Sequence, residues 1–182
     1  MSEMFSRRVF MRGLGVVAAA AALTACSSTN EAVNQALIEG AVGGIVAADC
    51  KIGRMTYWAA NATVPVNEIS FRIVMTNVSS KPVTLSGDNF ATTLDGTPIP
   101  PFNFSARDVG DADIWRTYDS LTIRPGEERS VALAYEISQP TYDSWYRSSR
   151  TVAVSFTCGN QRVTYTKNSR SDEITVSDIE TL

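Results

Sequence analysis

The sequence predicts an all-β protein built as an antiparallel β-sandwich. Apolar and polar residues alternate with a period of two in several short segments, most clearly in 69–76 and 131–137. Glycine, proline, asparagine and aspartate interrupt the chain about every 8–12 residues, which is typical of short strands joined by tight turns. Residues 26–182 are enough for one domain with a hydrophobic core.

The chain begins with a segment typical of a removable export signal. Arg7 and Arg8 precede an uncharged apolar stretch, 13–23. This stretch is shorter than the roughly 20 residues that a membrane-spanning helix needs. The pattern Ser-Arg-Arg-x-Phe-Met at 6–11 resembles a bacterial twin-arginine signal. The resemblance implies that residues 1–25 are a signal peptide that is removed after export.

The end of this signal resembles the lipobox of bacterial lipoproteins, with Leu-Thr-Ala-Cys at 23–26. The resemblance implies cleavage before Cys26 and its acylation with chains such as palmitate, which anchor the protein to a membrane. Ser27, rather than Asp, at the next position favours the outer membrane facing the periplasm, if the source is Gram-negative. The alternative is an ordinary secretory signal with an incidental cysteine.

Residues 26–43 are expected to form the lipidated tether and a short helical or flexible linker. Small residues recur at every fourth position from here onward: Ala36, Gly40, Gly44 and Ala48. On a helix over 31–48 they would form one face suited to close helix packing. Glycine disfavours a helix, so the alternative is a linker followed by a strand at 44–50. Both alternatives remain open.

The sandwich domain is expected to span residues 44–168, followed by a polar C-terminal tail at 169–182. Two loops interrupt it: an Asp- and Gly-rich loop at 105–113, and an aromatic loop at 139–150 with room for one helical turn. Asp95-Gly96 predicts a tight hairpin, because both residues tolerate positive φ. Strands are expected at 69–76, 83–85, 90–94, 114–123, 131–137, 152–158 and 162–167, with a further edge strand at 173–176.

Four segments between residues 67 and 140 carry a family resemblance. They are Asn-Val-Ser-Ser-Lys-Pro-Val-Thr-Leu at 77–85, Asp88 to Gly96, Leu121 to Glu127, and Tyr135-Glu136-Ile137. In this order they are similar to telokin-like, immunoglobulin-like domains of unknown function in bacterial lipoproteins. The resemblance implies an immunoglobulin-like antiparallel β-sandwich. It implies no catalytic residues, because the matching positions are turn and core residues.

Composition excludes several function classes. The chain has no histidine, which removes Ser-His-Asp and Cys-His catalysis and histidine-based zinc or copper sites. Its 16 basic and 19 acidic residues give a net charge of −3 without a basic run, so nucleic-acid binding is not expected. No cofactor is expected. Asp108, Asp111 and Asp113 flank Gly110 and offer oxygen ligands for calcium, but they lack the EF-hand spacing, so a solvated loop and no metal are predicted.

Three cysteines are present, Cys26, Cys50 and Cys158. Lipidation of Cys26 would leave the other two as a pair in an oxidising compartment, where thiols tend to form disulfides. We therefore predict a Cys50–Cys158 disulfide. The alternative is two buried free thiols.

Tyr142, Trp145 and Tyr146 form a candidate binding surface for a glycan or a partner protein. The alternative is that they pack over the open end of the sandwich. These features together predict an envelope lipoprotein that is not an enzyme and acts as a binding or scaffolding module. Its expected partners are the membrane, through the lipid, and an envelope protein. The alternatives are a small-ligand- or glycan-binding lipoprotein and a carboxylate-dependent cell-wall hydrolase.

Overall fold

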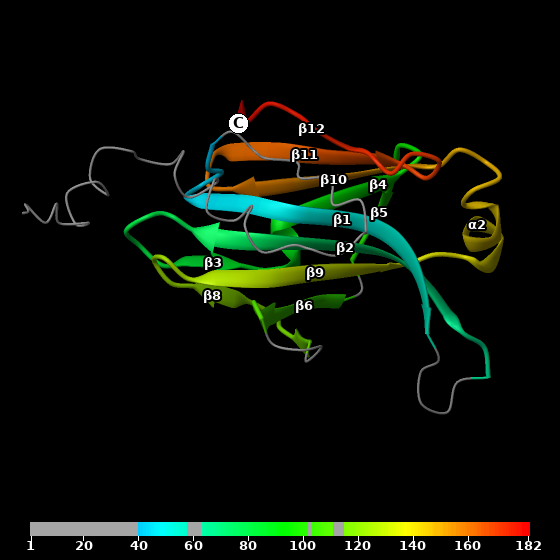
Figure 1. The fold of residues 1–182 in the computed structure, drawn as a ribbon, viewed down its shortest axis with the longest axis horizontal. Helices are drawn as coiled ribbons and strands as arrows, with labels where there is room; N and C mark the ends of the chain where they lie inside the picture. Colours follow the sequence, from blue (N-terminus) through cyan, green and yellow to red (C-terminus); the bar gives the residue numbers. More distant parts are fainter. Residues whose placement is uncertain (1–39, 58–62, 102, 111–114) are drawn as a thin grey trace, which may run out of the picture. The chain divides into compact units, whose positions relative to one another are not determined.

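The computed structural model describes residues 40–57, 63–101, 103–110 and 115–182. These residues form an all-β, antiparallel β-sandwich of two main sheets (Figure 1). Arg7, Arg8 and Cys26 lie outside the described residues, as do most of the predicted tether and Asp111 and Asp113. No helix among the described residues is long and apolar enough to cross a bilayer.

The first sheet carries the longest strands. Its order is β1 (Ile45–Tyr57), β2 (Val66–Asn77), β9 (Glu128–Glu136), β6 (Asn103–Asp108) and β7 (Arg116–Thr117), and all neighbours pair antiparallel. β1 and β2 pair from Ile45–Asn77 to Tyr57–Val66, with a bulge between Ala48 and Lys51. The chain therefore enters the domain along an edge of this sheet.

The second sheet packs against the first. Its order is β12 (Ile174–Val176), β11 (Gln161–Asn168), β10 (Thr151–Cys158), β4 (Phe90–Leu94) and β5 (Thr97–Ile99), while β13 (Glu180–Thr181) also pairs with β11. A small sheet joins β3 (Val83–Leu85) to β8 (Leu121–Ile123), and η3 (Gly87–Asn89) is a single 3-10 turn. β12 and β13 thus extend the sheet beyond the predicted domain end at residue 168.

The predicted period-two pattern builds the core. Every second residue of β2 faces inward, and Ile69, Phe71, Ile73 and Met75 are at most 2% exposed. The Phe71 ring lies 6.1 Å from Phe90 and 5.6 Å from Tyr165, which brings the two sheets together. Such aromatic pairs add about 0.5–1.5 kcal/mol each beyond their buried area.

The turn between β4 and β5 is the predicted hairpin. Asp95 and Gly96 take φ of 52° and 80°, and Leu94 pairs directly with Thr97. Positive φ at both central residues defines the type I′ turn, whose twist matches that of the flanking strands.

Three predicted segments differ from the structure. The described part of the strand predicted at 114–123 is divided between β7 and β8, which belong to different sheets. Residues 105–108 belong to β6 rather than to a loop, because Phe104 and Ala106 alternate inward and are 6% and 1% exposed. β1 starts at Ile45 and runs beyond Cys50, so the described part of 31–48 is not helical. Gly44, just before β1, has a φ of 86°, which an α-helix does not contain.

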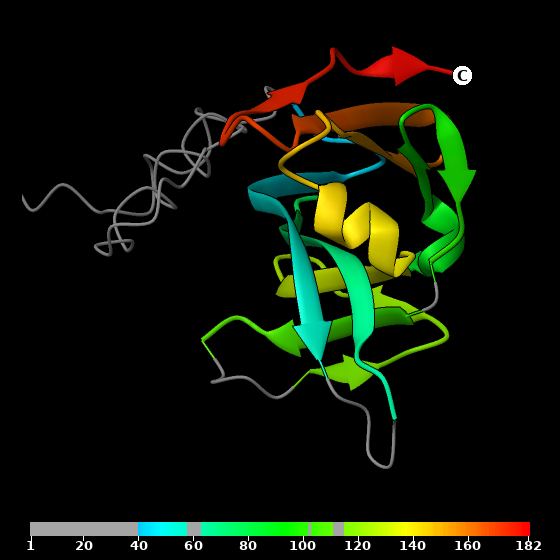
Figure 2. The ribbon, with the colours of Figure 1, turned by 90° about the vertical axis from the view of Figure 1, so that its right-hand side faces the viewer.

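The segment between β9 and β10 closes one end of the sandwich. It contains α2 (Gln139–Ser144), which lies across the opening between the sheets (Figure 2). Ser138 caps the helix through its side chain, which accepts a hydrogen bond from the Thr141 amide. Trp145 follows the helix and enters the core, where it is 1% exposed.

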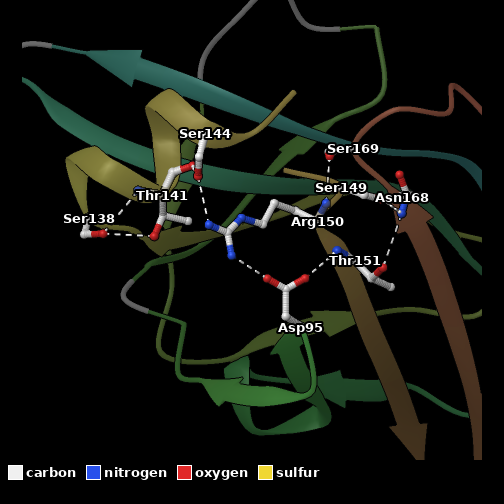
Figure 3. A network of polar contacts seen from close by, with 9 residues as sticks. All are labelled: Asp95, Ser138, Thr141, Ser144, Ser149, Arg150, Thr151, Asn168 and Ser169. Atoms are coloured by element: carbon white, nitrogen blue, oxygen red, sulfur yellow. Dashed lines mark hydrogen bonds and ion pairs between the residues drawn. The ribbon is translucent and has the colours of Figure 1, made fainter. Parts of the chain in front are cut away.

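Arg150 connects this end of the molecule to the β4–β5 hairpin (Figure 3). Its guanidinium donates hydrogen bonds of 2.8 Å to Asp95 Oδ2 and to Ser144 Oγ. Asp95 Oδ1 accepts a further bond of 2.8 Å from the Thr151 amide. One residue pair therefore joins the hairpin, α2 and the start of β10.

The predicted disulfide is wrong, because Cys50 and Cys158 are free, buried thiols in this structure. Cys158 packs against Gly43, with its sulfur 3.7 Å from that carbonyl oxygen. Cys50 lies farther along β1, at roughly 16 Å from Ile45 when a strand rises about 3.3 Å per residue. A disulfide needs Cα atoms within about 7 Å. Burial raises the pKa of both thiols, which keeps them protonated and unreactive.

Candidate functional site

A shallow groove lies on the outer face of the first sheet. Its volume is about 180 Å³. The residues that shape it are Glu68, Ser70, Arg72, Asn103, Trp115 and Ala134. They come from β2, β9, β6 and the segment before β7, so the groove crosses the strands rather than following one of them.

The groove exists because small residues occupy the middle of this outer face. Side chains alternate between the two faces along each strand. Residues that pair directly across neighbouring strands form a row, and their side chains point to the same face of the sheet. One row runs Gly53–Ser70–Ala134–Asn103 across β1, β2, β9 and β6. Three small residues in a row leave a depression between taller neighbours.

One side of the groove is acidic. Glu68 pairs directly with Glu136 in the β2–β9 register, so the two carboxylates start from opposite positions on the same face. Like charges in this arrangement destabilise a sheet. Glu68 is only 7% exposed and accepts no hydrogen bond from the described residues. Burial raises the pKa of Glu68, and the nearby Arg72 partly lowers it.

The other side of the groove is cationic and aromatic. The Arg72 Cζ atom lies 5.5 Å from the Trp115 ring centroid, and the Arg107 Cζ atom lies 5.0 Å from it. Such contacts are favourable by about 0.5–1 kcal/mol at exposed sites. Arg72 also donates through Nη2 to the Met55 sulfur at 3.1 Å. No carboxylate of the described residues lies within 4 Å of its guanidinium.

The predicted acidic loop takes part in a different feature. Asp108 forms an ion pair with Arg129, which also pairs with Glu127. Asp108 and Arg129 border a second hollow of about 170 Å³ with Arg107, Arg116 and Tyr118. Among the described residues, no group of three or more Asp, Glu, Cys or His side chains is placed to hold a metal ion. Because Asp108, the carboxylate that lines this hollow, is already paired with Arg129, this hollow is the weaker candidate.

The predicted aromatic surface is divided by the fold. Trp145 lies in the core and not on a binding surface, which agrees with the alternative that it packs over the open end of the sandwich. Arg54 of β1 lies over the rings of Tyr142 and Tyr146, at 4.3 and 4.8 Å from their centroids. It also donates to the Tyr142 carbonyl oxygen at 2.6 Å. Tyr142 thus anchors α2 to β1, while Tyr146 remains 60% exposed.

Sequence reasoning did not identify Glu68, Arg72 or Trp115. The sequence nevertheless contains one indication of the groove. Outward positions of a strand usually carry longer polar side chains. Here Ala132 and Ala134 occupy outward positions of β9. Small residues on an expected solvent face indicate either a covering element or a depression.

Fold and groove together define an all-β, antiparallel sandwich protein with a polar groove on one outer face. No protein-family model matches the chain, and no curated protein matches it. An uncharacterized β-sandwich protein from Clostridium difficile 630 aligns with 78% of this chain and 97% of its own, at 14% identity and a TM-score of 0.44.

Two other solved structures align less closely. The yjhA protein from Bacillus subtilis aligns with 64% of this chain and 79% of its own, at 12% identity and a TM-score of 0.39. A functionally unknown protein from Listeria monocytogenes EGD-e aligns with 69% of this chain and 73% of its own, at 11% identity and a TM-score of 0.41. These values carry no argument about what this chain does.

Proposed function

We propose that this chain is a lipid-anchored envelope protein that binds another component, without catalysis, through the groove on its first sheet. The observation that carries the proposal is the groove itself. It presents a carboxylate and a guanidinium that are not paired with each other, on a face whose centre is otherwise made of small residues. Unpaired, partly buried charges lower stability, so their presence favours a role in recognition.

The location in this proposal rests on the sequence. The twin-arginine-like pattern at 6–11 and the lipobox-like pattern at 23–26 occur in the order that an exported lipoprotein requires. Acylated Cys26 would hold the domain at the outer membrane, facing the periplasm, if the source is Gram-negative. The polar segment after Cys26 would act as a flexible tether.

The finer fold in this proposal is immunoglobulin-like. β1, β2, β4, β6, β9, β10 and β11 can be labelled A to G in chain order. The first sheet then has the order A-B-E-D and the second contains G-F-C, which are the two sheets of an immunoglobulin constant-type domain. This connectivity supports the resemblance found in residues 67–140, and such domains commonly act as binding modules.

Site-specific crosslinking in the native membrane tests the proposal. A photoreactive residue in place of Ser70, on the groove floor, should capture one envelope component in stoichiometric amounts. The matched control is the same residue in place of Ala91, which is exposed on the outer face of the second sheet. Capture at both positions, or at neither, would contradict a binding role for the groove.

The alternative function is that of a cell-wall glycan hydrolase. An assay of glycan turnover by the purified protein tests this alternative. Glu68 and Glu136 are the carboxylates that the groove region brings together. Turnover of cell-wall glycans that is lost in Glu68→Gln would show that the protein is an enzyme. We expect no turnover by the unaltered protein.

A further inference from the structure

We propose that the groove binds a zwitterionic ligand of amino-acid size, with its ammonium group against Glu68 and its carboxylate against Arg72. The ligand is either a free amino acid or the terminal residue of a larger molecule that carries both charges. This inference rests on the proposed function, because it names the chemistry recognised at the same groove.

The acidic side of the groove offers a carboxylate that can accept hydrogen bonds from a ligand. Glu68 is 7% exposed, accepts no hydrogen bond from the described residues, and lies opposite the like-charged Glu136. A carboxylate in this position is stabilised by a group that donates hydrogen bonds and carries positive charge. A primary ammonium group supplies both. A metal ion fits less well, because no cluster of three ligating side chains exists among the described residues.

The cationic side of the groove offers a guanidinium that can donate hydrogen bonds to a ligand. Arg72 makes one contact to a thioether sulfur and one to the Trp115 ring, and neither of them is a strong hydrogen-bond acceptor. Its guanidinium interacts electrostatically with Glu68, but the two groups do not form an ion pair within 4 Å. A ligand carboxylate can occupy this position and accept two parallel hydrogen bonds from the planar guanidinium.

The floor and the size of the groove fit a small polar molecule. Its volume is about 180 Å³, well above the roughly 10–15 Å³ that one water molecule needs, so it has room for a small organic molecule. Ser70 and Asn103 border the floor with a hydroxyl and an amide. The Asn103 oxygen accepts a bond of 3.2 Å from Thr117, which leaves the amide hydrogens as donors toward a bound ligand.

Other ligand classes leave a charge uncompensated. A neutral sugar would pair with neither Glu68 nor Arg72 through an opposite charge. A phosphate or another simple anion would suit Arg72 but would meet the repulsion of Glu68 and Glu136. Only a ligand that carries both an ammonium and a carboxylate group pairs each charge of the groove with an opposite charge. A zwitterion therefore fits the groove better than a sugar or a simple anion.

Calorimetric or NMR titration of the purified full chain tests the inference. The probes are alanine, leucine and lysine, each compared with its N-acetyl derivative and its methyl ester, with methyl glucoside as a neutral probe. We expect at least one free amino acid to bind. Loss of either ligand charge should weaken its binding about tenfold or more, as expected for a charge-assisted hydrogen bond.

Two variants assign each charge to its partner. In Glu68→Gln the free amino acid and its N-acetyl derivative should bind equally. In Arg72→Gln the free amino acid and its methyl ester should bind equally. Glu180→Gln and Arg162→Gln are the controls. They remove an acid and a base that pair with each other on the second sheet, away from the groove, and should leave binding unchanged.

The inference is overturned if no free amino acid binds, if the blocked derivatives bind as well as the free ones, or if methyl glucoside binds better. These results differ from failure of the proposed function. If Ser70 crosslinks a partner but no zwitterion binds, the groove is still a binding face and only the ligand chemistry is wrong. If neither occurs, both proposals fail.

Discussion

Asn77 shows how one buried polar residue can hold several loops together. It is fully buried at the end of β2. Its Nδ2 donates to the carbonyl oxygens of Lys81 and Ile123, each at 2.8 Å. Its Oδ1 accepts from the Ser79 amide at 2.9 Å and from the Ser79 hydroxyl at 2.7 Å. The side chain thus uses its full hydrogen-bonding capacity.

Asn77→Ala should lower the free energy of unfolding by about 3 kcal/mol, because it leaves several buried groups without a partner. Denaturant unfolding measures this loss. Asn160→Ala, in the exposed turn between β10 and β11, is the control and should change stability by less than about 0.5 kcal/mol. Equal stability of the two variants would show that the loops do not depend on Asn77.

Glu68 should make stability fall as the pH rises. Burial raises its pKa above the ordinary value of 4.5, so the folded state favours the protonated form. Stability is then lost as the pH rises from about 4.5 through the raised pKa. The positive charge of Arg72 opposes this effect, because it lowers the pKa of Glu68.

Glu68→Gln should therefore be more stable than the unaltered protein at pH 7, and the two should converge near pH 4. Urea unfolding at both pH values measures the difference. Glu136→Gln removes the like-charge pair and should add about 0.2–1 kcal/mol at pH 7. A Glu68→Gln protein that is less stable at pH 7 would show that its carboxylate is already compensated.

At the scale of the element, strands were predictable where the period-two pattern was long. β2, β9 and β10 satisfy this condition, since their inward residues are nearly all large and apolar. β6 was missed because only Phe104 and Ala106 mark its inward face, between polar neighbours. The pattern predicts the faces of a strand reliably only when it repeats several times.

The groove and the cysteines depend on register, which the sequence pattern does not contain. The groove row combines Gly53, Ser70, Ala134 and Asn103 from four strands that lie far apart in the chain. The number of cysteines predicts that Cys50 and Cys158 could pair, but it says nothing about the distance between them in the fold. For Trp145 both a binding surface and packing over the open end were considered, because local sequence does not distinguish an exposed aromatic loop from one that covers an open end.

The β4–β5 hairpin provides a prediction at this scale. Asp95 has positive φ and binds both Arg150 and the Thr151 amide. Asp95→Asn tolerates this φ and keeps an acceptor but loses the charge, so it should cost about 1 kcal/mol. Asp95→Ala loses both bonds and adds backbone strain, and should cost about 2 kcal/mol.

Thermal unfolding of the two variants measures these losses. The hydrogen bond from Arg150 lowers the pKa of Asp95, followed by the bond from the Thr151 amide. The contribution of Asp95 is therefore present above its ordinary pKa and is lost as the pH falls through the lowered value. If Asn and Ala cost the same at neutral pH, neither the acceptor that Asn retains nor the positive φ of residue 95 contributes to the stability of this turn.

At the scale of the whole molecule, the described domain has two different ends. β1 begins at one end, and α2 covers the other (Figure 1). A tether that enters at Ile45 would therefore hold the domain by the end opposite α2. The groove lies on the flank between these ends, on β2, β9 and β6.

The lipid anchor gives the prediction for the whole molecule. Cys26→Ala should abolish labelling by a fatty-acid analogue and release the protein from membranes, because each buried methylene of an acyl chain contributes about 0.8 kcal/mol to anchoring. Cys50→Ala and Cys158→Ala are the controls and should remain labelled, since these thiols are buried in the domain. Replacing both Arg7 and Arg8 with Lys should retain the precursor in the cytoplasm, which separates the twin-arginine route from general secretion. Labelling that persists in Cys26→Ala, or a mature N-terminus at another residue, would contradict the anchor and with it the location of the proposed binding module.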